Sequence, residues 1–288
     1  MPHDTIPAPP LGAAILPDLS RAEYDAIDAV RFSTLKHMAT SPLAYRHACD
    51  APSEQTPAMR LGTMAHSLVL GTADADLAVF PGEVRRGRAW EEFEAAHAGS
   101  GRTIVKASEL AEAQMIAHAV SNCTRARNLL AIGRAECAVV WEYDGQAVRS
   151  RLDWLAWTGC GTPWDGPPRI VEIKTTRRMD TFTREARWRH YHAQLALYAR
   201  GVQAATGWAP EVYIVAAQNE APWDVAAYRV TQATLAAGWE LCATWLGMVR
   251  ACEASGHWPG VDGGATLDLD VTAYDDATLV VGGEDVTP

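Results

Sequence analysis

The N-terminal half of the chain spaces its apolar residues as helices do. Residues 61–70 place four of them on one helical face, and a helical pattern also runs from 107 to 130. Residues 21–48 are predicted to be mostly helical, with Ser33 as an N-cap and Ser41, which precedes a proline, opening a second short helix. The pattern therefore predicts a helical N-terminal part.

The period changes after residue 135. Two alternating runs in AVVWEYDGQAVRSRLDWLAW flank Asp144-Gly145, a dipeptide typical of a β-hairpin turn. Further strands are predicted at 170–176, 211–218 and 226–230, with an amphipathic helix through RWRHYHAQLALYARGVQAATG and a long helix over 232–254. This order predicts an α/β (α+β) fold, a central mixed β-sheet flanked by helices.

Length and charge suggest one domain with additions. The 288 residues are 48% hydrophobic, enough for a sizeable core. We expect a flexible, Pro/Ala-rich arm at 1–20, a folded domain at 21–254 and an acidic tail at 255–288. The net charge is -10, but eight acidic residues and no Lys or Arg lie between Glu253 and Pro288, which leaves -2 on the rest. Between Arg169 and Arg200, eight basic residues accompany three acidic ones, so a local nucleic-acid site is compatible with the charge.

The sequence shows no sign of a membrane or secretory segment. No charge-free run is long enough to cross a bilayer, and the N-terminus lacks the basic start and apolar centre of a signal peptide, so we expect a cytoplasmic protein. Six cysteines are scattered without a C-x-x-C pair, which favours buried thiols over disulfides. An iron–sulfur site would require long-range assembly, and none is expected.

The stretch IVEIKTT carries the candidate chemistry. In a strand, Glu172 and Lys174 stand on the same face, although an E-x-K pattern alone is more often a solvated surface. If the hairpin pairs with this strand, Asp153 lies beside Glu172, and the two carboxylates offer oxygen ligands to Mg²⁺, with Mn²⁺ as a substitute. Lys174 would orient or deprotonate a water, or stabilise negative charge on a phosphate.

This D-(x)n-E-x-K arrangement resembles the PD-(D/E)xK restriction-endonuclease-like core. Gln194 and Tyr198, four apart on a helix, resemble the Q-x-x-x-Y helix of the branch that includes RecB, lambda-exonuclease-like and RecE proteins. His66 follows Arg60 and Gly62 as in that branch's R-x-G-x-x-x-H segment, although a lone histidine on an apolar helix is more often a core residue.

The N-terminal half narrows the resemblance. Its segments, in this order, are similar to the nuclease domain of the RecE (exodeoxyribonuclease VIII) family over roughly residues 22–250: Ser33-x-Leu35, Thr40-Ser41-Pro42-x-x-Tyr45, Pro57-Ala58-Met59-Arg60-x-Gly62 and Arg85-Arg86-Gly87-x-x-Trp90-x-x-Phe93. The tail past Ala254 has no counterpart in that pattern.

The resemblance implies roles for the residues at matching positions. His66, Asp153, Glu172 and the backbone carbonyl of Ile173 would hold the metal. Lys174 would serve the attacking water, and Gln194 and Tyr198 would orient the scissile phosphate or the lysine.

The resemblance also implies an activity and partners. It implies 5′-to-3′ digestion of linear double-stranded DNA in phage or prophage recombination. The resulting 3′ strand would pass to a single-strand annealing protein of the RecT/beta type, and the enzyme would form a ring-like homo-oligomer with no membrane partner.

Further residues and other functions stay open at this point. Glu136 is a possible additional acid, with a surface position as the alternative. The candidates for DNA contact are Arg60, Arg86, Arg177, Arg178 and Arg187. A CRISPR-adaptation-type nuclease is disfavoured because only Cys242 and Cys252 are available for its C-terminal cysteine cluster. An endonuclease and a catalytically inactive DNA-binding module remain alternatives.

Overall fold

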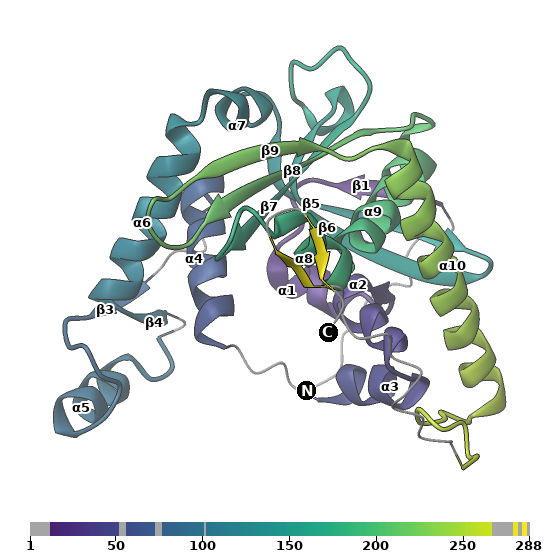
Figure 1. Ribbon diagram of the computed structural model, residues 1–288, viewed down its shortest axis with the longest axis horizontal. Coiled ribbons are helices and arrows are strands. Elements are labelled where there is room, and N and C mark those ends of the chain that lie inside the picture. The colour runs from purple at the N-terminus through teal and green to yellow at the C-terminus, as the bar shows by residue number, and fades with distance from the viewer. Residues whose placement is uncertain are drawn as a thin grey trace, which may run out of the picture.

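A seven-stranded mixed sheet forms the centre of the computed structural model (Figure 1). The structure describes residues 12–51, 56–72, 77–100, 102–266, 279–281 and 284–286. In this part of the chain the sheet has the order β1-β5-β6-β7-β8-β9, with β2 paired to β6. Its strands are β1 (Ala14–Leu16), β2 (Val30–Arg31), β5 (Arg134–Tyr143), β6 (Gln146–Ala156), β7 (Arg169–Thr176), β8 (Glu211–Gln218) and β9 (Val225–Arg229).

Helices surround this sheet. They are α1 (Arg21–Ala26), α2 (Phe32–Leu35), α3 (Pro42–Asp50), α4 (Pro57–Leu70), α5 (Arg88–His97), α6 (Ala107–Asn122), α7 (Thr124–Leu129), α8 (Phe182–Trp188), α9 (Tyr191–Thr206) and α10 (Gln232–Ser255), with 3₁₀ turns η1 (Lys36–Ala39) and η2 (Thr158–Cys160). A parallel pair, β3 (Leu77–Phe80) and β4 (Thr103–Lys106), brackets α5, and β10 (Leu279–Val281) pairs with β11 (Glu284–Val286). The predicted α/β (α+β) class, a mixed sheet flanked by helices, is confirmed.

The hairpin and the E-x-K strand pair as the sequence predicts. Asp144 and Gly145 turn between β5 and β6 with φ values of 49° and 78°, the left-handed conformation that this dipeptide tolerates. β7 runs antiparallel to β6 and parallel to β8. The paired positions of β6 and β7 end at Trp154 and Val171, one position short of Asp153 and Glu172. The sheet therefore opens where the two carboxylates lie.

The two faces of the sheet bury separate clusters. Ile170 packs with residues of α9 and α10, whereas its neighbour Val171 packs with residues of α4 and α6. Because side chains alternate along a strand, Glu172 and Lys174 share the face of Ile170 and turn toward α9. Figure 1 shows α4 and α6 on one side of the sheet, with α9 and α10 on the other. Helices on both sides of the sheet can therefore bring side chains to the point where β6 and β7 separate.

Several sequence predictions need correction. Residues 14–16 of the predicted arm form β1 and pair with β5, while residues 1–11 lie outside the described part. Ser33 is not an N-cap, because α2 begins one residue before it and Arg31 holds the cap position. The helix predicted over 107–130 breaks at Cys123, whose extended backbone separates α6 from α7.

The predicted tail starts as an ordered segment. Trp258 stacks on Tyr45 of α3 with ring centroids 5.6 Å apart, and the Leu43 amide donates to the Pro259 carbonyl at 3.0 Å. Most of the acidic residues beyond it lie outside the described residues. Ser41 caps α3 as predicted, its hydroxyl accepting from the Ala44 amide at 3.1 Å. Across the described chain, no helix combines the length and the apolar character that a membrane crossing requires.

Candidate active site

Asp153 occupies the point where β6 and β7 separate. Its Oδ2 accepts a hydrogen bond from the Ile173 amide at 2.8 Å. The carboxylate thus satisfies a backbone donor beside the end of the β6–β7 ladder. This contact fixes Asp153 beside the E-x-K strand, as the sequence predicts. The predicted role of the Ile173 carbonyl as a metal ligand stays a prediction.

His66 reaches Asp153 from the opposite helical layer. Gly62, one turn earlier on α4, lies close to Thr175 of β7: a Cβ built at Gly62 would meet the Thr175 hydroxyl at 3.5 Å. The His66 Nδ1 lies 3.4 Å from Asp153 Oδ2. Burial alone lowers the pKa of His66, but the Asp153 carboxylate outweighs it and the net shift is upward. Burial in turn raises the pKa of Asp153, yet His66, Lys174 and the Ile173 amide bring it below its usual value.

Glu172 is the most buried acid of the site. Its side chain is 3% exposed, and Oε1 accepts from Lys174 Nζ and from Gln194 Nε2, both at 2.8 Å. The second oxygen, Oε2, is also buried and has no hydrogen-bond partner among the described residues. Burial and the Asp153 carboxylate raise the pKa of Glu172 to about 7, against the lowering effect of Lys174. An additional cation beside Oε2 would remove this electrostatic cost.

Lys174 is held as an ammonium ion. Burial lowers its pKa, but Glu172 and Asp153 more than compensate, and the net pKa lies above the ordinary value. The Nζ also lies 4.7 Å from the centroid of the Tyr191 ring, a cation–π contact. This geometry favours a lysine that stabilises negative charge over one that removes a proton. Tyr191 is a site residue that the sequence analysis missed.

The Q-x-x-x-Y residues act as a linked pair on α9. The Gln194 amide donates both to Glu172 and to the Tyr198 hydroxyl, the latter at 2.9 Å. Burial raises the pKa of Tyr198 well above its ordinary value, so it remains a neutral phenol. The helix is held firmly in place: α10 approaches so closely at Gly238 that a Cβ there would lie 2.2 Å from the His192 carbonyl. Gln194 therefore orients Glu172 from a rigid support.

Glu136 lies on β5, across from Asp153. Its φ of 56° is left-handed, which is uncommon and strained for glutamate. The carboxylate forms an ion pair with Arg151. Burial is the main reason that the pKa of Glu136 is raised, and Asp153 raises it further. Glu136 is thus near the site, but its charge is already engaged by an arginine.

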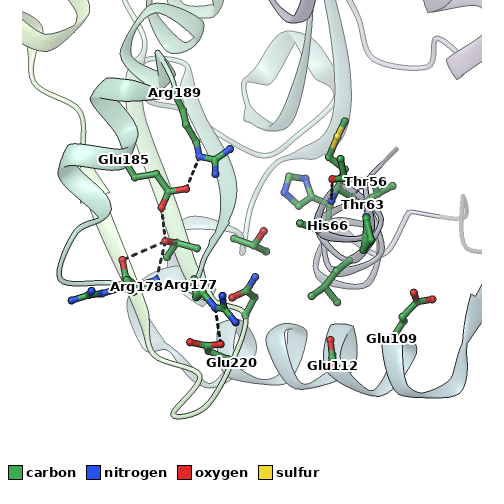
Figure 2. A pocket seen from close by; sticks show the side chains of 18 of the residues that line it. Thr56, Thr63, His66, Glu109, Glu112, Arg177, Arg178, Glu185, Arg189 and Glu220 are labelled. Carbon is green, nitrogen blue, oxygen red and sulfur yellow. Dashed lines mark hydrogen bonds and ion pairs between the residues drawn. The ribbon is translucent and has the colours of Figure 1, made fainter. Parts of the chain in front are cut away.

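A large cleft leads from α4 to α8. Its volume is about 1710 Å³, and His66 lies in its lining together with the residues that follow β7. Figure 2 shows His66 and Thr63 on one wall, with Glu185 and Arg189 on the opposite wall. Asp153 and Glu172 are not among the lining residues, whereas Tyr191, which covers Lys174, is. The cleft therefore ends beside the buried acids.

The predicted DNA-contacting arginines do not gather in one place. Arg177 and Arg178 line the cleft, but each pairs with an acid, Arg177 with Glu220 at 3.0 Å and Arg178 with Asp180. Arg187 lines a different groove, between α8 and α10. Arg86 is exposed before α5, Arg60 is partly buried on α4, and neither belongs to the cleft lining. Their DNA contacts stay predictions.

A smaller cavity of about 240 Å³ opens at Lys174, Gln194 and Tyr198, which all line it. It is also lined by Arg149 and Lys36, two basic residues that the sequence analysis did not single out. Arg149 is 6% exposed, donates to the Tyr24 carbonyl, and lies over the Tyr24 ring. Burial and the nearby Lys174 lower the pKa of Lys36. No local motif marks these residues, because η1 and β6 are joined at this cavity only by the tertiary fold.

The donor set suits a hard divalent cation. Mg²⁺ is usually bound by one or two carboxylates and keeps several waters, and Asp153 with Glu172 supplies such a pair, including the partnerless Oε2. Among the described residues, no three His, Cys, Asp or Glu side chains already form a metal-binding group. His66, Asp153 and Glu172 are therefore neighbours without forming a preformed cage.

Comparisons with known proteins identify the fold and the family. The structure resembles the crystal structure of a "putative exonuclease" from Eubacterium rectale, with a TM-score of 0.60 and 13% identity over 89% of this chain and 97% of that one. At this identity the likeness shows the fold alone. No curated protein matches the sequence significantly. The family model described as "PDDEXK-like domain of unknown function (DUF3799)" matches residues 31–267, which confirms the predicted PD-(D/E)xK core. The chain therefore belongs to this family of PDDEXK-like domains.

Proposed function

We propose that the protein is a metal-dependent deoxyribonuclease acting on linear double-stranded DNA. The observation that carries this proposal is the buried Glu172 carboxylate, which has one oxygen bonded to Lys174 and Gln194 and the other without a partner beside Asp153. A purely structural ion pair would not need a second buried acid and an orphaned oxygen. The PDDEXK-like family and the exonuclease-like fold support the same conclusion.

Asp153 and Glu172 would hold Mg²⁺, or Mn²⁺ in its place, with His66 and the Ile173 carbonyl as further ligands. The bound cation would lower the pKa of a water and polarise a phosphoryl oxygen. Lys174, kept charged by its carboxylate neighbours, would stabilise the negative charge that develops on the phosphate. Gln194 would fix the orientation of Glu172, and Tyr198 would fix Gln194.

The finer points of the proposal rest on the sequence resemblance to RecE-type nucleases. They are digestion from the 5′ end, release of a 3′ single strand to an annealing protein, assembly into a homo-oligomeric ring, and a role in phage-type recombination. The cleft that ends beside Lys174 is compatible with an entering DNA end.

End-labelled DNA tests the proposal. Linear duplexes labelled at either end and closed circular DNA are incubated with wild type or Lys174→Ala, in Mg²⁺ or in EDTA. We expect Mg²⁺-dependent loss of the 5′ label from linear DNA only, abolished by the substitution. Cleavage of circular DNA would show an endonuclease rather than an exonuclease. Intact substrates under every condition would refute the proposed nuclease activity.

A further inference from the structure

A second groove lies beside the cleft and is separated from it by α8. The groove has a volume of about 980 Å³ and lies between α8, β9 and α10; we call it the α8–α10 groove. Trp188 and Arg184 line both the cleft and this groove. The short helix α8 therefore forms a ridge between the two hollows.

The charges of the α8–α10 groove differ from those of the cleft. Arg184, Arg187 and Arg229 line it, and none of its described lining residues is Asp or Glu. Within the described residues, these three guanidinium groups form no ion pair with a carboxylate, although the protein carries a net charge of -10. In the cleft, by contrast, three of the arginines are paired with acids. The groove therefore offers unneutralised cations to an anionic chain.

Aromatic side chains accompany these cations. Tyr228 lines the groove and is partly exposed there, and it stacks on the buried ring of Phe182 with centroids 5.1 Å apart. Trp188 on the ridge is 76% exposed, and the Arg189 guanidinium lies 5.9 Å from its ring. A single exposed tryptophan is not unusual, but one placed between two hollows with arginines on either side is suited to stacking on a base. A cationic groove beside an exposed aromatic ring such as Trp188 is typical of proteins that bind single-stranded nucleic acid.

We propose that the α8–α10 groove binds single-stranded DNA, with Trp188 stacking on a base where the strand crosses the ridge. This inference rests on the proposed nuclease function and deepens it: one strand enters the cleft beside Lys174, and the strand that is not hydrolysed follows the groove. In this arrangement Arg187, which lies outside the cleft, would contact the strand in the groove.

Binding measurements in EDTA test this proposal without cleavage. The probe is a fluorescein-labelled oligothymidylate, followed by fluorescence anisotropy at several salt concentrations. Trp188→Ala should weaken binding roughly 5- to 160-fold, the usual effect of removing one stacking platform. The double variant Arg187→Ala/Arg229→Ala should lower the salt dependence of log K by about 1.4, since each lost phosphate contact contributes about 0.7.

Matched controls and a second readout keep the test decisive. Trp208→Ala removes another exposed tryptophan, 61% exposed, and Arg125→Ala removes an exposed arginine on α7; both should bind as wild type does. Should the Trp188 or arginine variants misfold, photo-cross-linking of a thiothymidine oligonucleotide to wild type should label α8 or β9.

Two results separate this inference from the nuclease itself. Unchanged oligonucleotide affinity in folded Trp188 and arginine variants would refute DNA binding in the α8–α10 groove, whatever the nuclease activity. A wild type that binds the oligonucleotide through these residues but hydrolyses no DNA would uphold the groove and overturn the proposed nuclease.

Discussion

Replacing Glu172 with glutamine should stabilise the metal-free protein above neutral pH. Burial and the Asp153 carboxylate raise the pKa of Glu172 from 4.5 to about 7, even with the Lys174 ammonium in contact. Between these two values the folded protein binds more protons than the unfolded chain, so its stability falls as the pH rises. The folding stability that protonated Glu172 contributes is complete below about pH 4.5 and is lost as the pH rises through about 7.

The size of this effect follows from the same shift. Each pKa unit corresponds to about 1.4 kcal/mol, so ionised Glu172 costs the folded protein on the order of 3 kcal/mol at about pH 8. Glutamine has the same length, carries no charge, and keeps an oxygen that can accept from Lys174. The variant should therefore be more stable than wild type by up to about 3 kcal/mol at about pH 8, and by little at about pH 5.

Urea unfolding followed by circular dichroism measures this difference in EDTA. Glu142→Gln, the same chemical change at an exposed position of β5, is the control and should leave stability nearly unchanged. Adding Mg²⁺ should stabilise wild type by mass action and Glu172→Gln much less. If the variant is less stable than wild type at about pH 8 without metal, ionisation of the buried Glu172 does not destabilise the folded protein and the prediction is wrong.

Three further predictions concern the supports of the site. Tyr198→Phe removes the hydroxyl that accepts from Gln194, a bond worth about 1 kcal/mol; we expect DNA hydrolysis to slow by about 5- to 10-fold in steady-state assays, and unchanged rates would dismiss the link between Tyr198, Gln194 and Glu172. Gly238→Ala should lower stability by about 1–3 kcal/mol because its Cβ meets the His192 carbonyl, whereas Gly247→Ala on the same helix, with only the end of Arg250 nearby, should be neutral or stabilising in thermal melts. Protonated His66 beside Asp153 stabilises the fold; this contribution is complete below the unfolded pKa of about 6.5 and is lost as the pH rises through the raised folded pKa. In EDTA, His66→Ala should therefore show a flatter dependence of unfolding free energy on pH than wild type, and an identical pH dependence would contradict this prediction.

Much of the fold follows from patterns that are local in the sequence. Asp144-Gly145 turns because both residues tolerate a left-handed backbone, and Ser41 caps α3 because its hydroxyl accepts from the Ala44 amide, with Pro42 favouring the helix start. Alternation in IVEIKTT places Glu172 and Lys174 on one face, and the four-residue spacing of Gln194 and Tyr198 brings their polar groups together. Strand and helix periodicity thus predicts which of these side chains lie together, whereas their catalytic roles rest on the resemblance.

The missed features depend on contacts between distant segments. The break at Cys123 has no glycine or proline to announce it, and β1 pairs with a strand more than a hundred residues away. Tyr191 and Arg149 reach the surroundings of Lys174 only through the packing of α9 and β6 around it. The sequence could not show that Arg177 is paired, because its partner Glu220 lies 43 residues away, and the partner of Arg178, Asp180, is brought close by the turn after β7.

The central claim is that a buried pair of carboxylates makes DNA hydrolysis depend on a divalent cation. The most direct measurement is the rate of nucleotide release from linear duplex DNA as a function of Mg²⁺ concentration, for wild type, Asp153→Asn and Glu142→Gln. We predict a Mg²⁺-dependent rate for wild type and for Glu142→Gln, and a loss of at least roughly 100-fold for folded Asp153→Asn. Undiminished, Mg²⁺-dependent hydrolysis by Asp153→Asn would contradict the account.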